Sequence, residues 1–330
     1  MSGVAMTASD PGESEGEGED FGDGFPHRIH ADAELAGGSA ADAQGWFGEA
    51  MPRLEPVLLR AGALLFRGFP LREAADFRRA VAAMAPLQLR DYAGGTSPRS
   101  KVDEGVYTST EYPRQLEIPL HNEMSYSLRW PGRLYFFCAT APQAGGETPL
   151  ADSRRVLQAM PASIVEEFER RGLMYVRNLA PAHAPYNAWS KAFETADRGQ
   201  VEAHCREMDI GCEWQPGGGL RIHERRPATR VHPLSGERVW FNQAHLFHAS
   251  NTPMGARVDA RIEAGLPMAA YYGDGGRIDN DTLAGVREVL RAQRRSFAWR
   301  QGDLLVVDNL LAAHGRLPFE GPRRILVAMA

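Results

Sequence analysis

The amino-acid sequence predicts a mainly β fold with flanking helices, a barrel or jelly roll, for this chain of 330 residues. Short apolar stretches recur along the chain, and Gly, Pro and Asp residues separate them as they separate successive short strands. Only a few stretches have helical spacing, and strands do not alternate with helices as in a βαβ fold. The 43% of hydrophobic residues suffices for a large core. We expect one domain over residues 26–330, without internal repeats.

The first 25 residues are predicted to be a disordered acidic tail. Residues 1–24 carry seven acidic and no basic side chains, with almost nothing apolar to bury, a composition typical of disordered segments. Because the formal net charge of the whole chain is −5, the remainder carries +2. A nearly neutral body lacks the basic surface that nucleic acid or an anionic membrane would require. We therefore expect neither as a partner.

The three cysteines point to a reducing compartment. Cys138, Cys205 and Cys212 are an odd number and form no C-x-x-C pair, which argues against a disulfide scaffold or a structural zinc site. The N-terminus lacks the basic and then apolar pattern of a signal peptide, and no apolar run approaches 18 residues. These features predict a cytoplasmic protein; they leave its oligomeric state open.

The first third of the chain is predicted to combine two helices with a strand. In the second helix, Phe77, Val81 and Met84 share one apolar stripe. A proline predicts a break in the first, because it removes a backbone N–H and clashes with the preceding turn. The expected elements are a helix over 46–59 broken at Pro52, a buried strand over 63–70, a helix over 76–84 and loops over 91–117, where the turn cluster 94–99 is a candidate flap.

Most of the expected strands lie in the rest of the chain. Residues 180–225 have weak periodicity and many Pro, Gly and His residues, so we interpret them as an inserted, lid-like segment over the barrel mouth, with a short helix at 200–208. The other expected elements are strands over 118–126, 133–139, 238–243, 297–300, 304–307 and 324–329, helices over 163–171 and 281–294, and a turn over 145–150 that enters another strand.

A histidine and a carboxylate two residues apart form the central motif. In the predicted strand over 118–126, His121, Glu123 and Ser125 share one face, because alternate side chains of a strand point the same way. On a helix, the first two would lie about 200° apart. One imidazole and one carboxylate are two thirds of the facial set of two His and one carboxylate that holds non-haem Fe(II). The second histidine must come from elsewhere.

His314 fits this requirement, because it follows the apolar strand that begins at residue 304. Ten residues later, Arg324 opens the last strand. A 2-oxo dicarboxylate that chelates the iron buries its distal carboxylate, which guanidinium can pair in bidentate fashion. Arg323 is the alternative, because adjacent strand residues face opposite ways and the spacing alone does not choose between them. Thr148 could add a hydroxyl bond to the same carboxylate.

Several segments together resemble a known family. They are His121-x-Glu123, the turn 145–149, Asp308-Asn309 with His314-Gly315-Arg316, and the arginine pair 323–324. They are similar to those of the taurine dioxygenase / clavaminate synthase-like Fe(II)/2-oxoglutarate dioxygenases, nearest the SyrP-like amino-acid hydroxylases. The resemblance runs from about residue 63 to residue 329. It implies a double-stranded β-helix (cupin-like) core, Fe(II) at His121, Glu123 and His314, and 2-oxoglutarate at Arg324, which the family spacing favours, and Thr148.

This resemblance also implies a reaction. The expected enzyme uses 2-oxoglutarate and O₂ as co-substrates, releases succinate and CO₂, and hydroxylates an unactivated C–H bond, at Cβ of an amino acid. The amino acid is either free or tethered to a peptide-synthetase carrier protein, and we expect the tethered form to react faster. The alternatives are a desaturase, a same-fold oxygenase of another small carboxylate or sulfonate, and a non-catalytic cupin-like binding protein.

Four further residues are candidates for contact with the substrate: Ser125, Arg129, Asn242 and Gln243. Each has a structural alternative, and for the arginine this is a solvated position on the surface. His245 and His248 are not expected to bind the metal, because three protein ligands must leave room for 2-oxoglutarate and O₂. Arg67 is expected in an ion pair at the edge of the core.

Overall fold

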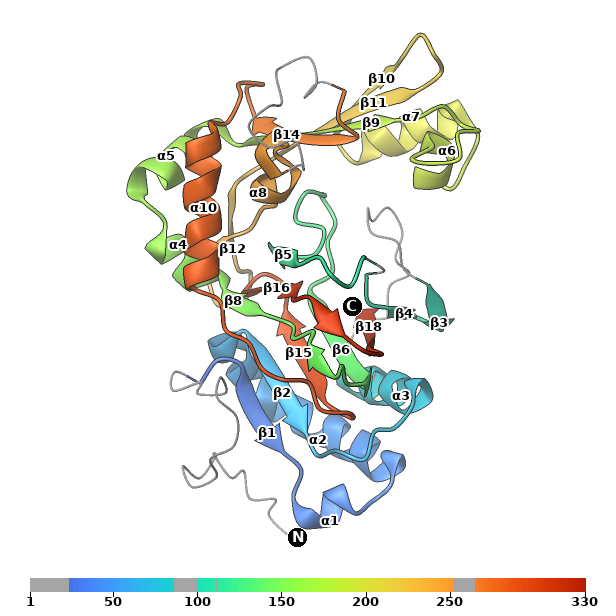
Figure 1. Cartoon of the computed structure of the whole chain (residues 1–330), viewed down its shortest axis with the longest axis vertical. Coiled ribbons are helices and arrows are strands. Elements are labelled where there is room, and N and C mark those ends of the chain that lie inside the picture. The colour runs from blue at the N-terminus through green and yellow to red at the C-terminus, as the bar shows by residue number, and fades with distance from the viewer. Residues whose placement is uncertain (1–23, 86–99, 111, 252–264) are drawn as a thin grey trace.

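Two facing sheets form the core of the protein in its computed structural model, which describes residues 24–85, 100–110, 112–251 and 265–330 (Figure 1). The larger sheet has the order β1-β2-β15-β6-β18-β4-β3, and the smaller has the order β5-β16-β8. Side chains from both sheets meet in one apolar cluster, which makes the core the expected jelly roll. The larger sheet consists of β1 (His27–His30), β2 (Ala63–Arg67), β3 (Lys101–Asp103), β4 (Val106–Thr108), β6 (Arg133–Thr140), β15 (Leu304–Asp308) and β18 (Arg324–Met329).

Alternation along β15 explains how the larger sheet packs. Leu305 and Val307 enter the cluster between the two sheets, while Leu304 and Val306 face the helices on the other side. These helices, α2 (Ala40–Ala61) and α3 (Ala74–Met84), lie beneath the sheet in Figure 1, next to the short α1 (Ala33–Ala36). The strand is therefore apolar on both faces, which is why it appears in the sequence as a continuous apolar run.

Helix α2 is continuous, so the break expected at Pro52 is wrong. Pro52 and Pro56 both lie inside the helix, four residues apart on its exposed face, while Met51 and Leu54 are buried. Carbonyl groups that lose their hydrogen bond to a proline N–H can turn to water there. Burial of the opposite face against β2 and α3 keeps the helix intact.

The smaller sheet places two histidines opposite each other. It consists of β5 (Ile118–His121), β8 (Leu150–Asp152) and β16 (Ala312–Arg316). β16 is the central strand, and its residue His314 pairs with both His121 and Leu150. Helices α4 (Ser153–Ala159), α5 (Ala162–Arg171) and α10 (Asn280–Ala292) contribute to the apolar cluster on its outer side.

A separate four-stranded sheet lies outside the jelly roll, at the top of Figure 1, and is called the second sheet below. Its order is β10-β11-β9-β14. Helix α7 packs against β10 and β11, and together they enclose a small apolar cluster of their own. Most of this unit comes from the segment expected as an insertion. Its elements are β9 (Leu173–Leu179), α6 (Trp189–Ala192), α7 (Arg198–Glu207), β10 (Ile210–Trp214), β11 (Leu220–Arg226) and β14 (Met268–Tyr272).

The remaining elements are short connections around these sheets. None of the helices in the described ranges combines the length and the apolarity that crossing a bilayer requires. The buried Arg67 pairs with Asp303, with 2.9 Å between Nη2 and Oδ2, as expected for an ion pair in the core. The connections are β7 (Ala144–Gly145), β12 (Thr229–Val231), β13 (Arg238–Trp240), α8 (Ala244–Phe247), the 3₁₀ turn Ala249–Asn251 and β17 (Phe319–Glu320).

The structure differs from the sequence-based expectation in three stretches of the chain. Residues 297–300 are not a strand, because Phe297 and Trp299 fill the core without ladder partners. The stretch 91–117, expected to be rich in loops, also contains the short strands β3 and β4 at the edge of the larger sheet. Phe25, which was expected to belong to the acidic tail, is 4% exposed and packs in the core. Residues 1–23 and the candidate flap 94–99 lie outside the described residues.

Candidate metal centre

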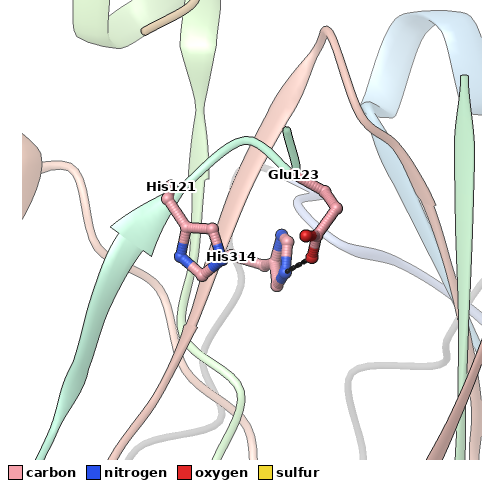
Figure 2. A group of neighbouring side chains, drawn as sticks. All are labelled: His121, Glu123 and His314. Carbon is pink, nitrogen blue, oxygen red and sulfur yellow. Dashed lines mark ion pairs between the residues drawn. The ribbon is translucent and has the colours of Figure 1, made fainter. Parts of the chain in front are cut away.

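Three side chains converge at one end of the smaller sheet (Figure 2). His121 is the last residue of β5, and His314 lies opposite it on β16. One potential ligand atom from each of His121, Glu123 and His314 lies within 4.8 Å of the other two. The Nε2 atom of His314 is 3.9 Å from Oε2 of Glu123, and the ring centroids of His121 and His314 are 4.5 Å apart. The expected cluster is therefore formed from residues far apart in the sequence.

A backbone carbonyl fixes the orientation of His121. Its Nδ1 lies 2.8 Å from the carbonyl oxygen of Pro119. Because a carbonyl can only accept a hydrogen bond, Nδ1 carries the proton and donates it. Nε2 is then the ring nitrogen with the lone pair, which is the form that binds a metal.

Glu123 reaches the cluster by a route other than the expected strand. β5 ends at His121, and Glu123 lies in the following turn. Its backbone N–H donates to Oδ1 of Asn309 at 2.7 Å, and Nδ2 of Asn309 donates back to the carbonyl of Glu123 at 2.9 Å. The same Nδ2 donates to the carbonyl of Pro131 at 2.8 Å. A fully buried asparagine therefore sets the position of the carboxylate, and strand alternation does not.

The donor set fits a non-haem iron site. Two imidazoles and one carboxylate on neighbouring segments form a facial set that leaves other coordination positions for small molecules. Glu123 and His314 are each only 5% exposed. Burial of a carboxylate beside two imidazoles is costly without a cation, which an Fe(II) ion would supply.

A small pocket of about 30 Å³ adjoins this cluster. Arg323 lines it, whereas the side chain of Arg324 is exposed on the other face of β18. Alternation along the strand explains the choice, because Ile325 and Val327 face the core between the sheets and Arg323 shares their side. The expectation that Arg324 faces the pocket is therefore wrong. The lining residues are Ser109, Thr110, Ile118, His121, Phe136, Thr148, His314, Gly315, Arg316, Arg323 and Ile325.

The charge of this small pocket suits a carboxylate. Burial and the neighbouring Arg316 lower the pKa of Arg323 to about 10. Arg316 is also buried and donates to the carbonyl oxygens of Tyr112, Pro113 and Leu116. In the described part of the chain, no carboxylate forms an ion pair with either guanidinium. The residues present therefore fit a dicarboxylate such as 2-oxoglutarate.

The turn at 145–149 makes room for Arg323. Gly146 has φ +73°, and a Cβ there would lie 2.9 Å from Cβ of Phe319 and 3.0 Å from Cδ of Arg323. The Nε atom of Arg323 donates to the carbonyl of Gly146 at 2.9 Å. Thr148, which is buried at the pocket wall, accepts a bond from Nε1 of Trp299 at 3.1 Å and keeps its own proton to donate.

Comparison with known proteins decides the family. Residues 27–329 match the sequence model of the family described as taurine catabolism dioxygenase TauD, TfdA family. The chain belongs to this family. Dapdiamide synthesis protein DdaC of Enterobacter agglomerans is 39% identical over 279 residues, 84% of each chain. A clavaminate synthase-like protein of Arabidopsis thaliana is 32% identical over 284 residues, 84% of this chain and 83% of that protein.

Solved structures share the fold of this TauD-family chain. An asparagine oxygenase in complex with Fe(II), 3-hydroxyasparagine and succinate has a TM-score of 0.54 and 14% identity, covering 92% of this chain and 93% of that one. PvcB of Pseudomonas aeruginosa has a TM-score of 0.50 and 18% identity, covering 86% and 80%. With the family established and the His–Glu–His cluster assembled, the protein is an Fe(II)- and 2-oxoglutarate-dependent dioxygenase.

Two of the expected substrate residues of this dioxygenase make structural hydrogen bonds. Nδ2 of Asn242 donates to the carbonyl of Ala228, and its Oδ1 accepts from the N–H of Ala244 at the start of α8. Nε2 of Gln243 donates to the carbonyl of Asn122 at 2.7 Å, next to Glu123. Ser125 is buried and lines neither the small pocket nor the large cavity described below. The hydrogen bonds of Asn242 and Gln243 favour their structural alternative, and contact of Ser125 with the substrate stays a prediction.

The two downstream histidines lie in the core. Nε2 of His245 donates to the carbonyl of Leu120 at 2.8 Å, and burial lowers the pKa of this residue to about 4. His248 bonds through its two ring nitrogens to Ser250 and to the carbonyl of Ile278. Neither belongs to the group of side chains that could hold a metal.

A cavity of about 480 Å³ lies between the jelly roll and the second sheet. Arg129 is the one substrate candidate that lines it; its exposed guanidinium pairs with Glu207 at 2.7 Å. The sequence analysis missed Arg177 and Glu224 on the opposite wall. Alternation of Leu173, Tyr175, Arg177 and Leu179 along β9 is the signal that would have found the first. The jelly roll contributes Met124, Tyr126, Ser127, Arg129, Trp130, Pro131 and Met329, and the second unit contributes Arg177, Phe193, Glu194, Val201, His204, Met208, Ile222 and Glu224, among others.

Proposed function

We propose that the protein hydroxylates the Cβ–H bond of an amino acid that is either free or tethered to a carrier protein. The large cavity supports this proposal best. Met124 and Tyr126, in the same turn as Glu123, line it, and its walls hold both guanidinium and carboxylate groups. Such a mixture suits a small zwitterion, whereas a polyanionic substrate would require a basic cluster. The names of two similar proteins, one of dapdiamide synthesis and one an asparagine oxygenase, agree with it.

The proposed roles of the site residues follow from their positions. His121, Glu123 and His314 hold the iron, and Arg323, with Thr148 and the nearby Arg316, holds the distal carboxylate of 2-oxoglutarate. When bound, iron and 2-oxoglutarate supply the oxidising chemistry, in which O₂, the substrate C–H bond and 2-oxoglutarate become alcohol, succinate and CO₂. The protein contributes the histidine tautomer, the paired charge and a pocket that excludes water.

The proposed location is the cytoplasm, in keeping with the three free thiols of the described chain. The proposed partners are an amino acid or an aminoacyl carrier protein. A carrier would deliver its aminoacyl group on a long phosphopantetheine arm, and the sequence-based expectation is that this form reacts faster. Both forms fit an opening between two separate units, and they differ in whether the substrate keeps its α-carboxylate.

A parallel assay tests the proposed function. The enzyme with Fe(II), 2-oxoglutarate and O₂ is incubated with each proteinogenic L-amino acid, and with the same amino acids loaded on a carrier protein. We expect one amino acid to give succinate and an alcohol in equal amounts, with a mass gain of one oxygen. A loss of two hydrogens would identify a desaturase. An absence of product and of substrate-stimulated succinate with every compound in both forms would overturn the proposal.

A further inference from the structure

Arg177 lies on the face of the second sheet that lines the large cavity. It is on β9, between Tyr175 and Leu179, which are buried on the same face. Its cross-strand partners are Ile222 on β11 and Met268 on β14. A half-buried guanidinium therefore replaces an apolar residue in an otherwise regular inward pattern. Such a replacement gives up apolar burial, so it calls for a compensating interaction.

Within the described residues, Arg177 has no carboxylate of its own, although it lies close enough to Glu224 to offset in part the rise that burial causes in the pKa of that acid. In the described part of the chain, Arg177 makes neither an ion pair nor a side-chain hydrogen bond. The nearby acid in the cavity wall is Glu224, and its Oε2 already accepts from Nη2 of the buried Arg226 at 2.8 Å. Arg230, whose guanidinium lies 4.8 Å from the ring centroid of Trp130, adds a further positive charge near Arg226. On this side the cavity is lined by Arg177, Glu194 and Glu224, and Arg226 is the ion-pair partner of Glu224.

We propose that Arg177 binds a carboxylate of the substrate in this cavity and so determines which substrates are accepted. The inference rests on the proposed function and deepens it. A guanidinium binds a carboxylate in bidentate fashion through two parallel hydrogen bonds. The cavity is also lined by Met124, the residue that follows Glu123 in the sequence, and by Tyr126. In this proposal, a substrate anchored at Arg177 has its other end at Met124.

This assignment distinguishes the two substrate forms. A free amino acid presents an α-carboxylate, whereas the thioester of a tethered amino acid has none. Arg177 therefore favours the free form, in contrast to the sequence-based expectation of faster reaction on a carrier. An amino acid with a side-chain carboxylate could also use Arg177 while tethered, so the experiment must separate these two sources of the carboxylate.

The experiment compares a substrate with its primary amide. The free amino acid with the highest turnover in the parallel assay is the probe, and its α-amide is the matched compound. We expect wild-type enzyme to have a KM for the amide about 10²-fold higher, because a bond to a charged group contributes roughly 1.5–3 kcal/mol. Calorimetry with the anaerobic Fe(II) and 2-oxoglutarate complex should give the same ratio of dissociation constants.

The variants locate the effect. Arg177→Gln should raise KM for the acid about 10²-fold and reduce the acid-to-amide preference to near one, while Arg177→Lys should restore part of it. The matched control is Arg221→Gln, because Arg221 lies on β11 of the same sheet but outside the lining of the cavity, between the inward-facing Leu220 and Ile222. We expect this control to keep the wild-type preference.

The outcomes separate the inference from the function on which it rests. An unchanged acid-to-amide preference in Arg177→Gln would overturn the role of Arg177, and so would a wild-type enzyme that prefers neither compound. Suppose that the enzyme turns over only carrier-bound amino acids and that these have no side-chain carboxylate. This result would also overturn the role of Arg177, while the hydroxylase proposal would stand. Failure of every free and tethered substrate would overturn both. Equal dependence on Arg177 for a tethered substrate with an acidic side chain would identify that group as the anchored carboxylate.

Discussion

Arginine side chains line both the small pocket beside the metal cluster and the large cavity, but different parts of the fold form the walls of the two. The small pocket is enclosed by strands of the jelly roll and by a glycine turn, and it measures about 30 Å³. The cavity measures about 480 Å³, and the second sheet, which has its own apolar cluster, forms half of its wall. The co-substrate side is thus part of the main core, and the substrate side is shared between two units.

This difference separates chemistry from specificity. His121, Thr148, His314 and Arg323 come from distant segments of the chain that the pairing of core strands brings together. The inward face of the second sheet is formed largely by the neighbouring strands β9, β10 and β11. Its link to the iron ligands among these contacts is Tyr175, which accepts from the N–H of Gln243, whose side chain in turn donates to the carbonyl of Asn122. The predictions below test how independent the two sides are.

Loss of a metal ligand should have the largest effect. His121→Ala or His314→Ala should abolish tight Fe(II) binding, because two remaining protein ligands cannot hold the ion in the facial geometry. His245→Ala, a histidine in the same core, should keep its iron. Metal stoichiometry after dialysis, with circular dichroism to confirm folding, measures the effect. Equal iron content in the wild type and in both ligand variants would refute the assignment.

Removal of the pocket arginine should have the next largest effect. Arg323→Gln leaves the distal carboxylate of 2-oxoglutarate without its partner, and it should raise the 2-oxoglutarate concentration for half-maximal succinate formation about 10²-fold. Arg324→Gln, one residue away on the exposed face, is the matched control and should change it little. The opposite ranking would favour the family spacing over the observed orientation of these side chains.

Protonation of His245 at low pH should have the smallest effect, which is a loss of folding stability. Burial lowers the pKa of His245 from 6.5 to about 4, so between these values the unfolded chain binds a proton that the folded chain does not. Stability is therefore retained above pH 6.5 and lost as pH falls toward 4, by about 2 kcal/mol between pH 7 and pH 5. His245→Gln keeps a donor for Leu120 and cannot titrate, so its denaturant midpoint should fall less over this range. Parallel curves for both proteins would contradict the assignment.

The sequence predicted the jelly roll and the three metal ligands because both depend on strongly patterned strands. The apolar runs that become β6, β15 and β18 are long enough to identify without a structure. His314 follows the second of these runs, and this position was sufficient to connect it with His121. The geometry of Glu123 was not predictable, because it depends on Asn309, a side chain distant in sequence.

The sequence predicted less well which face of a strand its charged side chains occupy. Arg323 and Arg324 differ only in which face of β18 they occupy, and the alternation that decides this begins at Ile325. The β10–β11 hairpin was read as an irregular insertion because charged residues such as Glu224 and Arg226 occupy its inward face. Their mutual ion pair satisfies these charges, and no hydropathy pattern reveals such a pair.

The contacts of Asn309 tie the integrity of the metal site to the connection between β15 and β16, which belong to different sheets. Asn309 lies between β15 and β16, it anchors the backbone of Glu123, and five residues later the same segment supplies His314, which pairs with His121. Local opening of this connection would therefore disturb the positions of Glu123 and His314 together. His121, Glu123 and His314 would hold the ion across these segments, so that metal release would be coupled to local opening of the barrel.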